Sequence, residues 1–374
     1  MPEPRGAPQR GPSHGRGPGA HSFVAHTMPG IEEIAWREVH ALSPDARCRG
    51  LRTAGEQNGL VLFDYLDDPR ALLRLRTAED VFFLAGWTRG IPSDRGGLNA
   101  LTTMVQTAKY FDVGLGMHRL LRGTARRRAT FRVIARMEGG AHAYRRVDVQ
   151  KAVEKGVLAR YNYKWHVVED DATLEVWVTL LDAEAICGLR LSDRSMRHRG
   201  YKSEHLPASL RPSVAAAMVL LSNPEPGDVF LDPMCGAGTI LGERAAAGPY
   251  QTLLGGDINK DSVQACRANV KPRRTPADIR EWDATRLPLP NASVDKAVSN
   301  LPFGKQIGTH AENVELYPRY FAEMARVVRP GGRLVILTGE RALTERLLPS
   351  FEAFRKREQF DVRVLGMAAR IDRM

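Results

Sequence analysis

Short apolar runs alternate with helical patterns through the second half of the chain, and this regularity limits the fold more than any other feature. Strand-like runs and helical periods follow one another from residue 229 to residue 340. Short buried strands separated by helices are typical of a doubly wound parallel sheet. The end differs, because two strand-like runs flank Gly366 with no helix between them, which indicates an antiparallel edge hairpin. The sequence therefore predicts a Rossmann-like α/β domain over residues 206–374.

The first half of the chain has a less regular pattern of strands and helices. Strand-like runs are expected at 22–26, 59–64, 130–136 and 174–182, and helical periods at 31–42 and 148–162. This pattern indicates α+β modules. Residues 1–20 are rich in Pro, Gly and Arg, so a disordered tail is expected there. The predicted organisation is a tail (1–20), a first module (21–98), a second module (99–190), a linker (191–205) and the C-terminal domain.

Composition excludes several classes of protein. The 374 residues are 43% hydrophobic with a formal net charge of +11, which is normal for a globular protein and suggests an anionic partner such as nucleic acid. No stretch approaches 18 consecutive apolar residues, so no membrane span is expected. The four cysteines form no CxxC pair, which excludes a zinc ribbon and argues against a disulfide scaffold. We expect a cytoplasmic monomer with no metal and no membrane partner.

The first candidate site is the glycine-rich segment Asp232–Thr239, which follows the first strand of the predicted sheet. Gly236 and Gly238 would allow a tight turn and a close approach to a ligand, although a connection that binds nothing is the simpler alternative. A nicotinamide fingerprint fits poorly, because Leu241 stands where it needs a third glycine, and no P-loop lysine follows. Asp232, before the glycines, suits a cationic ligand better than a pyrophosphate, and Asp257 stands about 20 residues later, where an acidic residue usually contacts ribose hydroxyls. S-adenosylmethionine, a sulfonium that carries an adenosine, fits this pattern.

The second candidate site is Asn300–Gly304, which follows the fourth strand. The amide oxygen of Asn300 and the backbone carbonyl of Leu301 could accept both protons of an exocyclic amine and stabilise the charge that develops on methyl transfer. Pro302 would stiffen the loop, and Phe303 would stack on a flipped base. The alternatives are a capping role for Asn300 and a core position for Phe303. The segment contains no cysteine, so thiolate attack on a pyrimidine ring is not expected.

Together these motifs resemble the Rossmann-type amino-methyltransferases, and residues 207–219 resemble the family motif that precedes the first strand. The first half resembles a ferredoxin-like module followed by a THUMP domain. This combination is typical of THUMP-domain tRNA guanine-N2 methyltransferases. Leu301 replaces a proline of the family's commoner Asn/Asp-Pro-Pro-Tyr/Phe pattern, but it keeps the carbonyl. The resemblance implies a catalytic set of Asn300, Leu301, Pro302 and Phe303, and a cofactor set of Ser209, Asp232, Pro233, Cys235, Gly236, Gly238, Thr239, Asp257, Ile258, Asp283, Ala284 and Asn300.

In this resemblance, Asp257 would hold the ribose, Asp283 the adenine amine, and Asn300–Phe303 the guanine. The implied activity is S-adenosylmethionine-dependent formation of N2-methylguanosine in the tRNA acceptor stem, with position 6 the leading guess. The THUMP module would grip the acceptor end and its 3′ terminus. A guanine of rRNA or another RNA, a DNA adenine, and a non-catalytic RNA-binding role are the alternatives.

Basic residues are concentrated in the predicted THUMP module. Thirteen Lys or Arg stand against three acids between Arg119 and Lys164. Phosphate contacts dominate nucleic-acid affinity, whereas a solvated charged face is the alternative. A second basic group lies in the linker. The candidate RNA-binding residues are Arg126, Arg127, Arg128, Arg145, Arg146, Arg197 and Arg199.

Overall fold

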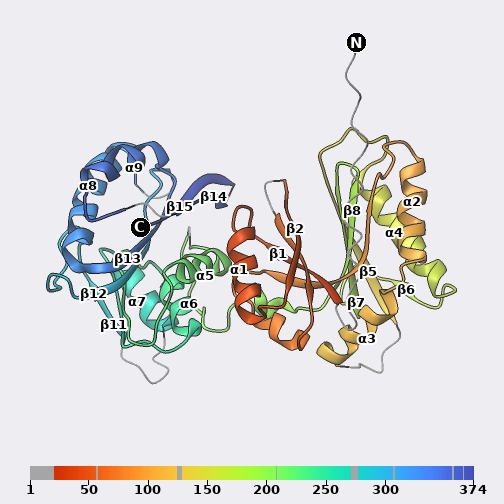
Figure 1. Ribbon diagram of the computed structural model, residues 1–374, viewed down its shortest axis with the longest axis horizontal. Coiled ribbons are helices and arrows are strands. Elements are labelled where there is room, and N and C mark those ends of the chain that lie inside the picture. Colours follow the sequence, from red (N-terminus) through yellow and green to blue (C-terminus); the bar gives the residue numbers. More distant parts are fainter. Residues whose placement is uncertain are drawn as a thin grey trace, which may run out of the picture.

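The computed structural model describes residues 21–55, 58–123, 129–207, 209–270, 277–305, 308–355, 358–364 and 366–374. It contains an eight-stranded sheet in the first half of the chain and a seven-stranded sheet in the second half (Figure 1). The predicted tail lies outside the described residues. Within them, the helices are too short or too polar to cross a membrane.

The first sheet has the strand order β2-β3-β1-β4-β8-β7-β5-β6. The strands expected near 22–26, 59–64, 130–136 and 174–182 are confirmed, as are both helical periods. Because β4 pairs antiparallel with β8, the strands of the two predicted modules share one sheet, and the boundary between the modules stays a prediction. The strands are β1 (His21–Thr27), β2 (Arg47–Ala54), β3 (Asn58–Tyr65), β4 (Asp80–Arg89), β5 (Thr130–Glu138), β6 (His166–Val167), β7 (Leu174–Leu181) and β8 (Glu184–Arg190).

Helices cover one face of this sheet. Strand side chains alternate between two apolar clusters, so that Phe83 packs with the helices while Phe82 packs on the opposite face. Figure 1 shows α2 and α4 side by side along the sheet. The helices are α1 (Glu32–Leu42), α2 (Gly96–Gln106), α3 (Phe111–Arg122) and α4 (Arg146–Arg160), with a 3₁₀ turn at Pro69–Arg74.

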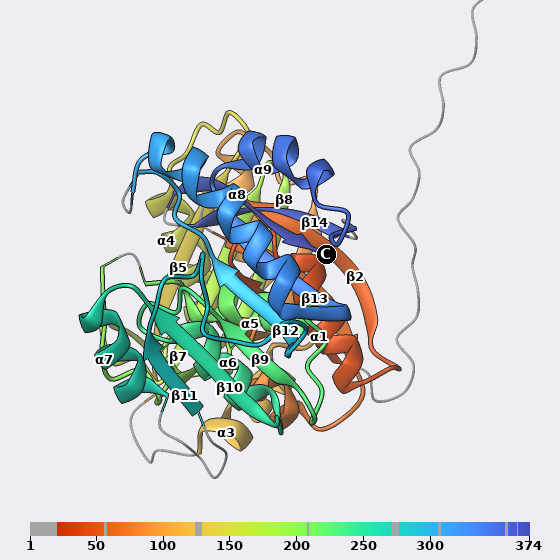
Figure 2. The same cartoon turned by 90° about the vertical axis from the view of Figure 1, so that its left-hand side faces the viewer.

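The second sheet has the order β11-β10-β9-β12-β13-β15-β14, in which the first five strands are parallel (Figure 2). The final hairpin is antiparallel, as the sequence predicts. The order reverses between β9 and β12, which is where open α/β sheets bind ligands. The strands are β9 (Val229–Asp232), β10 (Thr252–Asp257), β11 (Ala277–Glu281), β12 (Val294–Asn300), β13 (Val328–Thr338), β14 (Glu358–Val364) and β15 (Met367–Arg373).

Helices cover both faces of the second sheet, as expected for a doubly wound fold. Phe230 packs with the helices of one face and its neighbour Leu231 with those of the other, because successive strand residues point to opposite sides. The first face carries α5 (Pro212–Leu221), α6 (Thr239–Ala247) and α7 (Lys260–Asn269), and the second carries α8 (His310–Val327) and α9 (Arg341–Leu347).

The two halves of the chain share an apolar core. Ile31 and Ile34, at the start of α1, are fully buried in the same cluster as Val214 and Met218 of α5. The backbone N–H of Arg363 in β14 also donates to the carbonyl of Pro29, at 3.2 Å. The arrangement of the two sheets is therefore held by direct packing as well as by the linker.

Candidate active site

The connection between β9 and α6 is shaped by two glycines with different tasks. Gly236 and Gly238 have positive φ angles of 49° and 76°, which other residues rarely adopt. A Cβ on Gly238 would lie 2.7 Å from the Cys266 sulfur, so this glycine lets α7 pack closely. A Cβ on Gly236 would meet no described atom within 4 Å. The backbone at Gly236 is therefore open to a ligand.

The third glycine that a dinucleotide fingerprint requires is replaced by a glycine on a neighbouring strand. Leu241 of α6 lies against Gly255 of β10, where a Cβ would come within 2.4 Å of its Cδ1. The close approach of helix and strand is thus preserved with the small residue on the opposite partner.

Asp257, at the end of β10, holds the glycine-rich loop in place. Its Oδ2 accepts from the Gly236 N–H at 3.0 Å, and its Oδ1 accepts from the Asn259 N–H at 3.0 Å. The next residue, Ile258, is 75% exposed, so an apolar side chain stands beside the loop with little protein contact. The predicted contacts of Asp257 with a ribose and of Ile258 with the cofactor remain proposals.

Asp232, at the end of β9, is 1% exposed. Burial raises the pKa of this carboxyl well above its ordinary value, and the nearby Asp257 carboxylate raises it further, while a hydrogen bond from the Met234 N–H opposes both. A cation bound at this edge of the sheet would favour the ionised form of the Asp232 carboxyl. The edge therefore suits a positively charged ligand.

Trp282 is a part of the site that sequence reasoning missed. Its ring lies against Gly256, where a Cβ would come within 2.3 Å, and its Nε1–H donates to the Pro233 carbonyl at 3.1 Å. It thereby fixes the loop after β9 and places the next two residues. Asp283 accepts from the N–H and the hydroxyl of Thr285, both at 2.8 Å, whereas Ala284 is buried.

Asn300 lies at the end of β12, next to β9 at the point where the strand order reverses. Its Oδ1 atom is buried and has no hydrogen-bond partner among the described residues. A buried acceptor without a partner is costly, and such groups in native proteins often mark a ligand position. This atom is therefore available to an N–H donor brought by a ligand.

The loop after Asn300 is ordered by several contacts. Leu301 is 1% exposed, and its N–H donates to the Leu337 carbonyl at 2.9 Å. The Pro302 carbonyl accepts hydrogen bonds from two side chains of α8, Asn313 and Tyr317. Phe303 is half-buried, with its ring against Gly339. The ring is thus partly a core residue, as in the alternative reading, and stacking on a base stays a prediction.

Ser209 and Cys235 lie on the same side of the sheet as the glycine-rich loop. The Ser209 hydroxyl accepts from the Leu206 N–H at 3.3 Å, just before α5. Cys235 is buried, and its N–H donates to the Gly256 carbonyl at 2.9 Å. Thr239 is buried at the first turn of α6. The predicted cofactor residues between Asp232 and Asn300 therefore lie around the ends of β9, β10, β11 and β12, whereas the place of Ser209 in the cofactor site stays a prediction.

The chain is similar in sequence to known proteins that share one activity in their names. The chain is 32% identical over 256 residues to the Mus musculus protein named tRNA (guanine(6)-N(2))-methyltransferase THUMP3. The matched region covers 64% of this chain and 50% of the relative. The chain spans about half the length of that relative. A Thermus thermophilus protein named tRNA (guanine(6)-N2)-methyltransferase is 30% identical over 228 residues, or 60% of this chain and 67% of the relative. The chain belongs to the THUMP-domain guanine-N2 methyltransferase family.

Two further findings agree with membership of this family. Residues 199–369 match the UPF0020 family model, described as an RMKL-like methyltransferase domain. The crystal structure of TrmN from Thermus thermophilus superimposes with a TM-score of 0.75 and 26% sequence identity, covering 94% of this chain and 98% of that one. The Rossmann-like methyltransferase fold is thereby confirmed.

In this member of the THUMP-domain family, the predicted RNA-binding arginines differ in accessibility. Arg145, just before α4, keeps 84% of its side chain exposed, and Arg146 is also exposed. Arg197 is ion-paired with the buried Asp80. Arg199 is 8% exposed, and its Nε–H donates to Glu243 at 3.2 Å. We therefore leave Arg197 and Arg199 out of the proposed RNA surface. Arg126, Arg127 and Arg128 lie outside the described residues.

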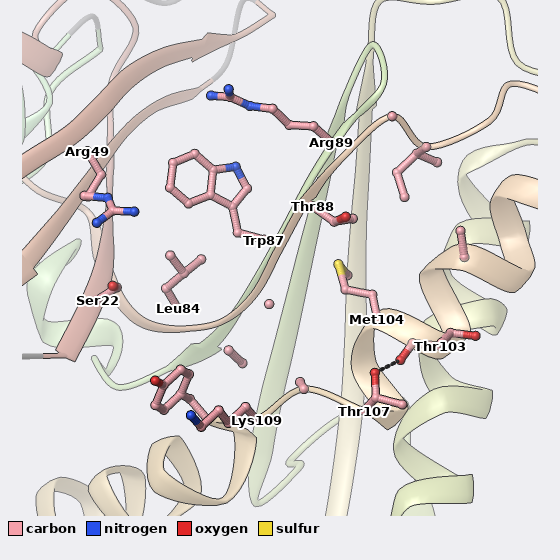
Figure 3. Close-up of a pocket in the computed structure, with 17 residues that line it drawn as sticks. Ser22, Arg49, Leu84, Trp87, Thr88, Arg89, Thr103, Met104, Thr107 and Lys109 are labelled. Atoms are coloured by element: carbon pink, nitrogen blue, oxygen red, sulfur yellow. Dashed lines mark hydrogen bonds between the residues drawn. The ribbon is translucent and has the colours of Figure 1, made fainter. Parts of the chain in front are cut away.

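A pocket of about 700 Å³ lies between β4 and α2 (Figure 3). Trp87 stands on its wall between the guanidinium groups of Arg49 and Arg89, which lie 5.8 and 5.5 Å from the ring centre. Both arginines are also ion-paired, with Asp64 at 3.1 Å and Glu184 at 3.0 Å. Most of the positive charge at this pocket is therefore balanced within the protein.

The segment before α5 supports the cofactor loop through residues that sequence reasoning missed. Asn269, at the end of α7, donates from Nδ2 to the carbonyls of Ala237 and Glu204, each at 2.9 Å. Tyr201 packs on Gly242 and donates to Glu243 of α6 at 2.7 Å. No local sequence motif predicts the roles of Asn269 and Tyr201, because their hydrogen-bond partners lie far away in the sequence.

Proposed function

We propose that this chain transfers a methyl group from S-adenosylmethionine to the exocyclic N2 amine of a guanosine in tRNA. The observation that carries the proposal is the buried, unpartnered Oδ1 atom of Asn300 at the point where the strand order reverses. The names of the relatives support the choice of guanine N2 and of tRNA. On the same ground we propose position 6 of the acceptor stem.

The cofactor site proposed for this chain is the edge formed by the ends of β9, β10 and β11. The open backbone at Gly236, the buried Asp232 and the exposed Ile258 fit a cationic ligand with a flat ring. Bound there, S-adenosylmethionine supplies an electrophilic methyl group on a positively charged sulfur. Asp257 would hold its ribose and Asp283 its adenine amine.

The chain's own contribution to transfer is to hold the amine. An exocyclic amine is a weak nucleophile because its lone pair is delocalised into the ring. Asn300 Oδ1 and the Leu301 carbonyl would accept its two protons, orient the nitrogen and stabilise the positive charge that forms on it. Phe303 would contact the face of the guanine. Fixed acceptors need no reorganisation during the reaction.

RNA binding is assigned to the first half of the chain. Arg145 and Arg146 are exposed there and can pair with phosphates. The pocket beside Trp87 offers an aromatic wall to an unstacked nucleotide. Cytoplasmic location and action as a monomer stay predictions from the sequence.

Nucleoside mass spectrometry tests the proposal. Purified protein, S-adenosylmethionine and a tRNA transcript with guanosine at position 6 should give N2-methylguanosine, and a transcript with adenosine at position 6 should give none. Methylation of rRNA or DNA instead would reassign the substrate. Cofactor binding without product on any of these substrates would favour the non-catalytic alternative. Asn300→Ala should abolish product while cofactor binding and thermal stability persist.

A further inference from the structure

The carbonyl of Pro302, within the proposed catalytic loop, faces away from the sheet edge and into α8. It accepts from Asn313 Nδ2 at 2.9 Å and from the Tyr317 hydroxyl at 2.8 Å. A carbonyl oxygen has two lone pairs, and both are used here. The peptide after Leu301 is therefore held in one orientation by two side chains of a single helix.

The donors are themselves fixed by the end of β13. The Tyr317 hydroxyl has one proton, which goes to Pro302, so the contact with Thr338 Oγ1 at 2.8 Å requires Thr338 to donate. Thr338 in turn accepts from the Glu340 N–H at 2.9 Å. The second amide proton of Asn313 reaches Glu340 Oε1 at 3.3 Å. Because Tyr317, Thr338 and Asn313 are at most 1% exposed, water cannot readily replace these bonds.

The loop is also pinned on both sides of the Pro302 carbonyl. The Leu301 N–H donates to Leu337 at 2.9 Å. Gly304 has a φ of 69°, and a Cβ there would come within 2.7 Å of Glu340 Oε1 and 3.0 Å of Asn313 Nδ2. The loop thus closes directly over the side chains that hold it. Because Asn300 directly precedes the bonded Leu301 N–H, these contacts also restrict the position of its backbone.

We propose that Tyr317 and Asn313 are positioning residues that set the orientation of the Asn300–Phe303 loop for methyl transfer. The inference rests on the proposed function, because it assigns these residues to that same site. Neither side chain needs to touch the cofactor or the RNA. Their effect is on the geometry of the acceptors that hold the amine, which transfer reactions require to within a fraction of an ångström.

Tyr317→Phe removes one of the two bonds to Pro302 and keeps the ring. Its kcat should fall by about 10- to 100-fold, while KM for RNA and the Kd for S-adenosylmethionine change less than about twofold. Tyr144→Phe is the matched control, because the buried Tyr144 hydroxyl also donates to a proline carbonyl, that of Pro92 at 2.9 Å, in the other half of the chain. The control should lose similar thermal stability and keep its kcat.

Hydrogen exchange at residues 299–305 tests the positioning role separately from the reaction. Exchange in this segment should become faster in Tyr317→Phe and in Asn313→Ala, and stay unchanged in Tyr144→Phe. Unchanged exchange in both α8 variants, or a kcat of Tyr317→Phe equal to that of the control, would overturn the proposal. A wild-type protein with no methyl transfer to any RNA would refute the proposed function, whereas the exchange result would still decide whether Tyr317 and Asn313 order the loop.

Discussion

Glu243 of α6 and Arg76 of the first half form an ion pair of 2.6 Å, although they lie 167 residues apart in the sequence. The Glu243 side chain is fully buried, and its other oxygen contacts Arg199 at 3.2 Å and the Tyr201 hydroxyl at 2.7 Å. The Nη2 of Arg199 also donates to the Arg76 carbonyl at 2.6 Å. One carboxylate of α6 therefore joins the catalytic half to the linker and to the segment that precedes β4 in the first half.

Glu243→Gln should destabilise the whole chain. The substitution takes the shared carboxylate away from two guanidinium groups that are 26% and 8% exposed, and breaking a buried pair in this way costs about 3–5 kcal/mol. Glu33→Gln is the control, since Glu33 is 56% exposed and pairs with Arg37 on the same helix, an arrangement worth less than about 1 kcal/mol. Chemical denaturation measures both. Equal losses in the two variants would contradict the assigned role of Glu243.

Affinity for S-adenosylmethionine should rise with pH in the wild type. Burial raises the pKa of Asp232, so the carboxylate that attracts a cation forms only as the pH passes that raised value. Asp232→Asn should bind more weakly and lose this pH dependence. Asp283→Asn is the control. Hydrogen bonds from Thr285 lower the pKa of Asp283, so this carboxyl is ionised throughout the neutral range. Loss of its charge should therefore weaken binding of S-adenosylmethionine equally at every pH. Calorimetric titration between pH 5 and 8 distinguishes the two patterns.

Replacing Arg145 and Arg146 with Ala should weaken tRNA binding and reduce the slope of log K against log salt by about 1–2. Both side chains are exposed, and the surface contact of Arg145 with Asp148, at 3.7 Å, is weak enough for a phosphate to replace it. Arg329→Ala is the control, because Arg329 is 55% exposed at the amino end of β13, the edge opposite the candidate site. Filter binding over a salt series gives the slopes. Indistinguishable slopes for the two variants would remove Arg145 and Arg146 from the interface.

Stability should decrease as the pH falls from about 7 to about 4. Burial, together with the smaller effect of the positive charges of Arg122 and Arg119, lowers the pKa of His118 on α3 to about 4. Between that value and the ordinary pKa of about 6.5, the unfolded chain binds a proton that the folded chain does not. The slope from this group is at most about 1.4 kcal/mol per pH unit. His118→Gln should flatten the profile in denaturation experiments; an unchanged slope would show that other groups dominate.

The parts of the site that the sequence predicts are those governed by local pattern and strand direction. Asp232, Asp257 and Asn300 each end a parallel strand, and parallel strands bring such ends to one edge. The residues that secure this edge follow no such rule. Trp282 reaches Pro233, 49 residues away, and its role depends on Gly256 lacking a side chain.

Arg145 and Arg199 show why charge pattern alone cannot tell which side chains a partner can reach. Arg145 and Arg199 are both arginines in basic segments, yet one is exposed and the other is 8% exposed beside a buried carboxylate. The difference comes from Glu243, whose place opposite Arg199 is fixed only when α6 packs against the linker. The sequence shows how many basic side chains a segment carries. The fold determines which of them are exposed to a binding partner and which are paired inside the protein.

The contacts of Glu243 also limit how this chain can be recombined with others. A chimera that placed a foreign RNA-binding half before residue 206 would remove Arg76, Arg199 and Tyr201 together. The catalytic half would then keep an anion in its interior with no counter-charge. A functional transplant must therefore bring two cations and a hydroxyl to this position, or replace Glu243 with an apolar residue of similar volume at the same time.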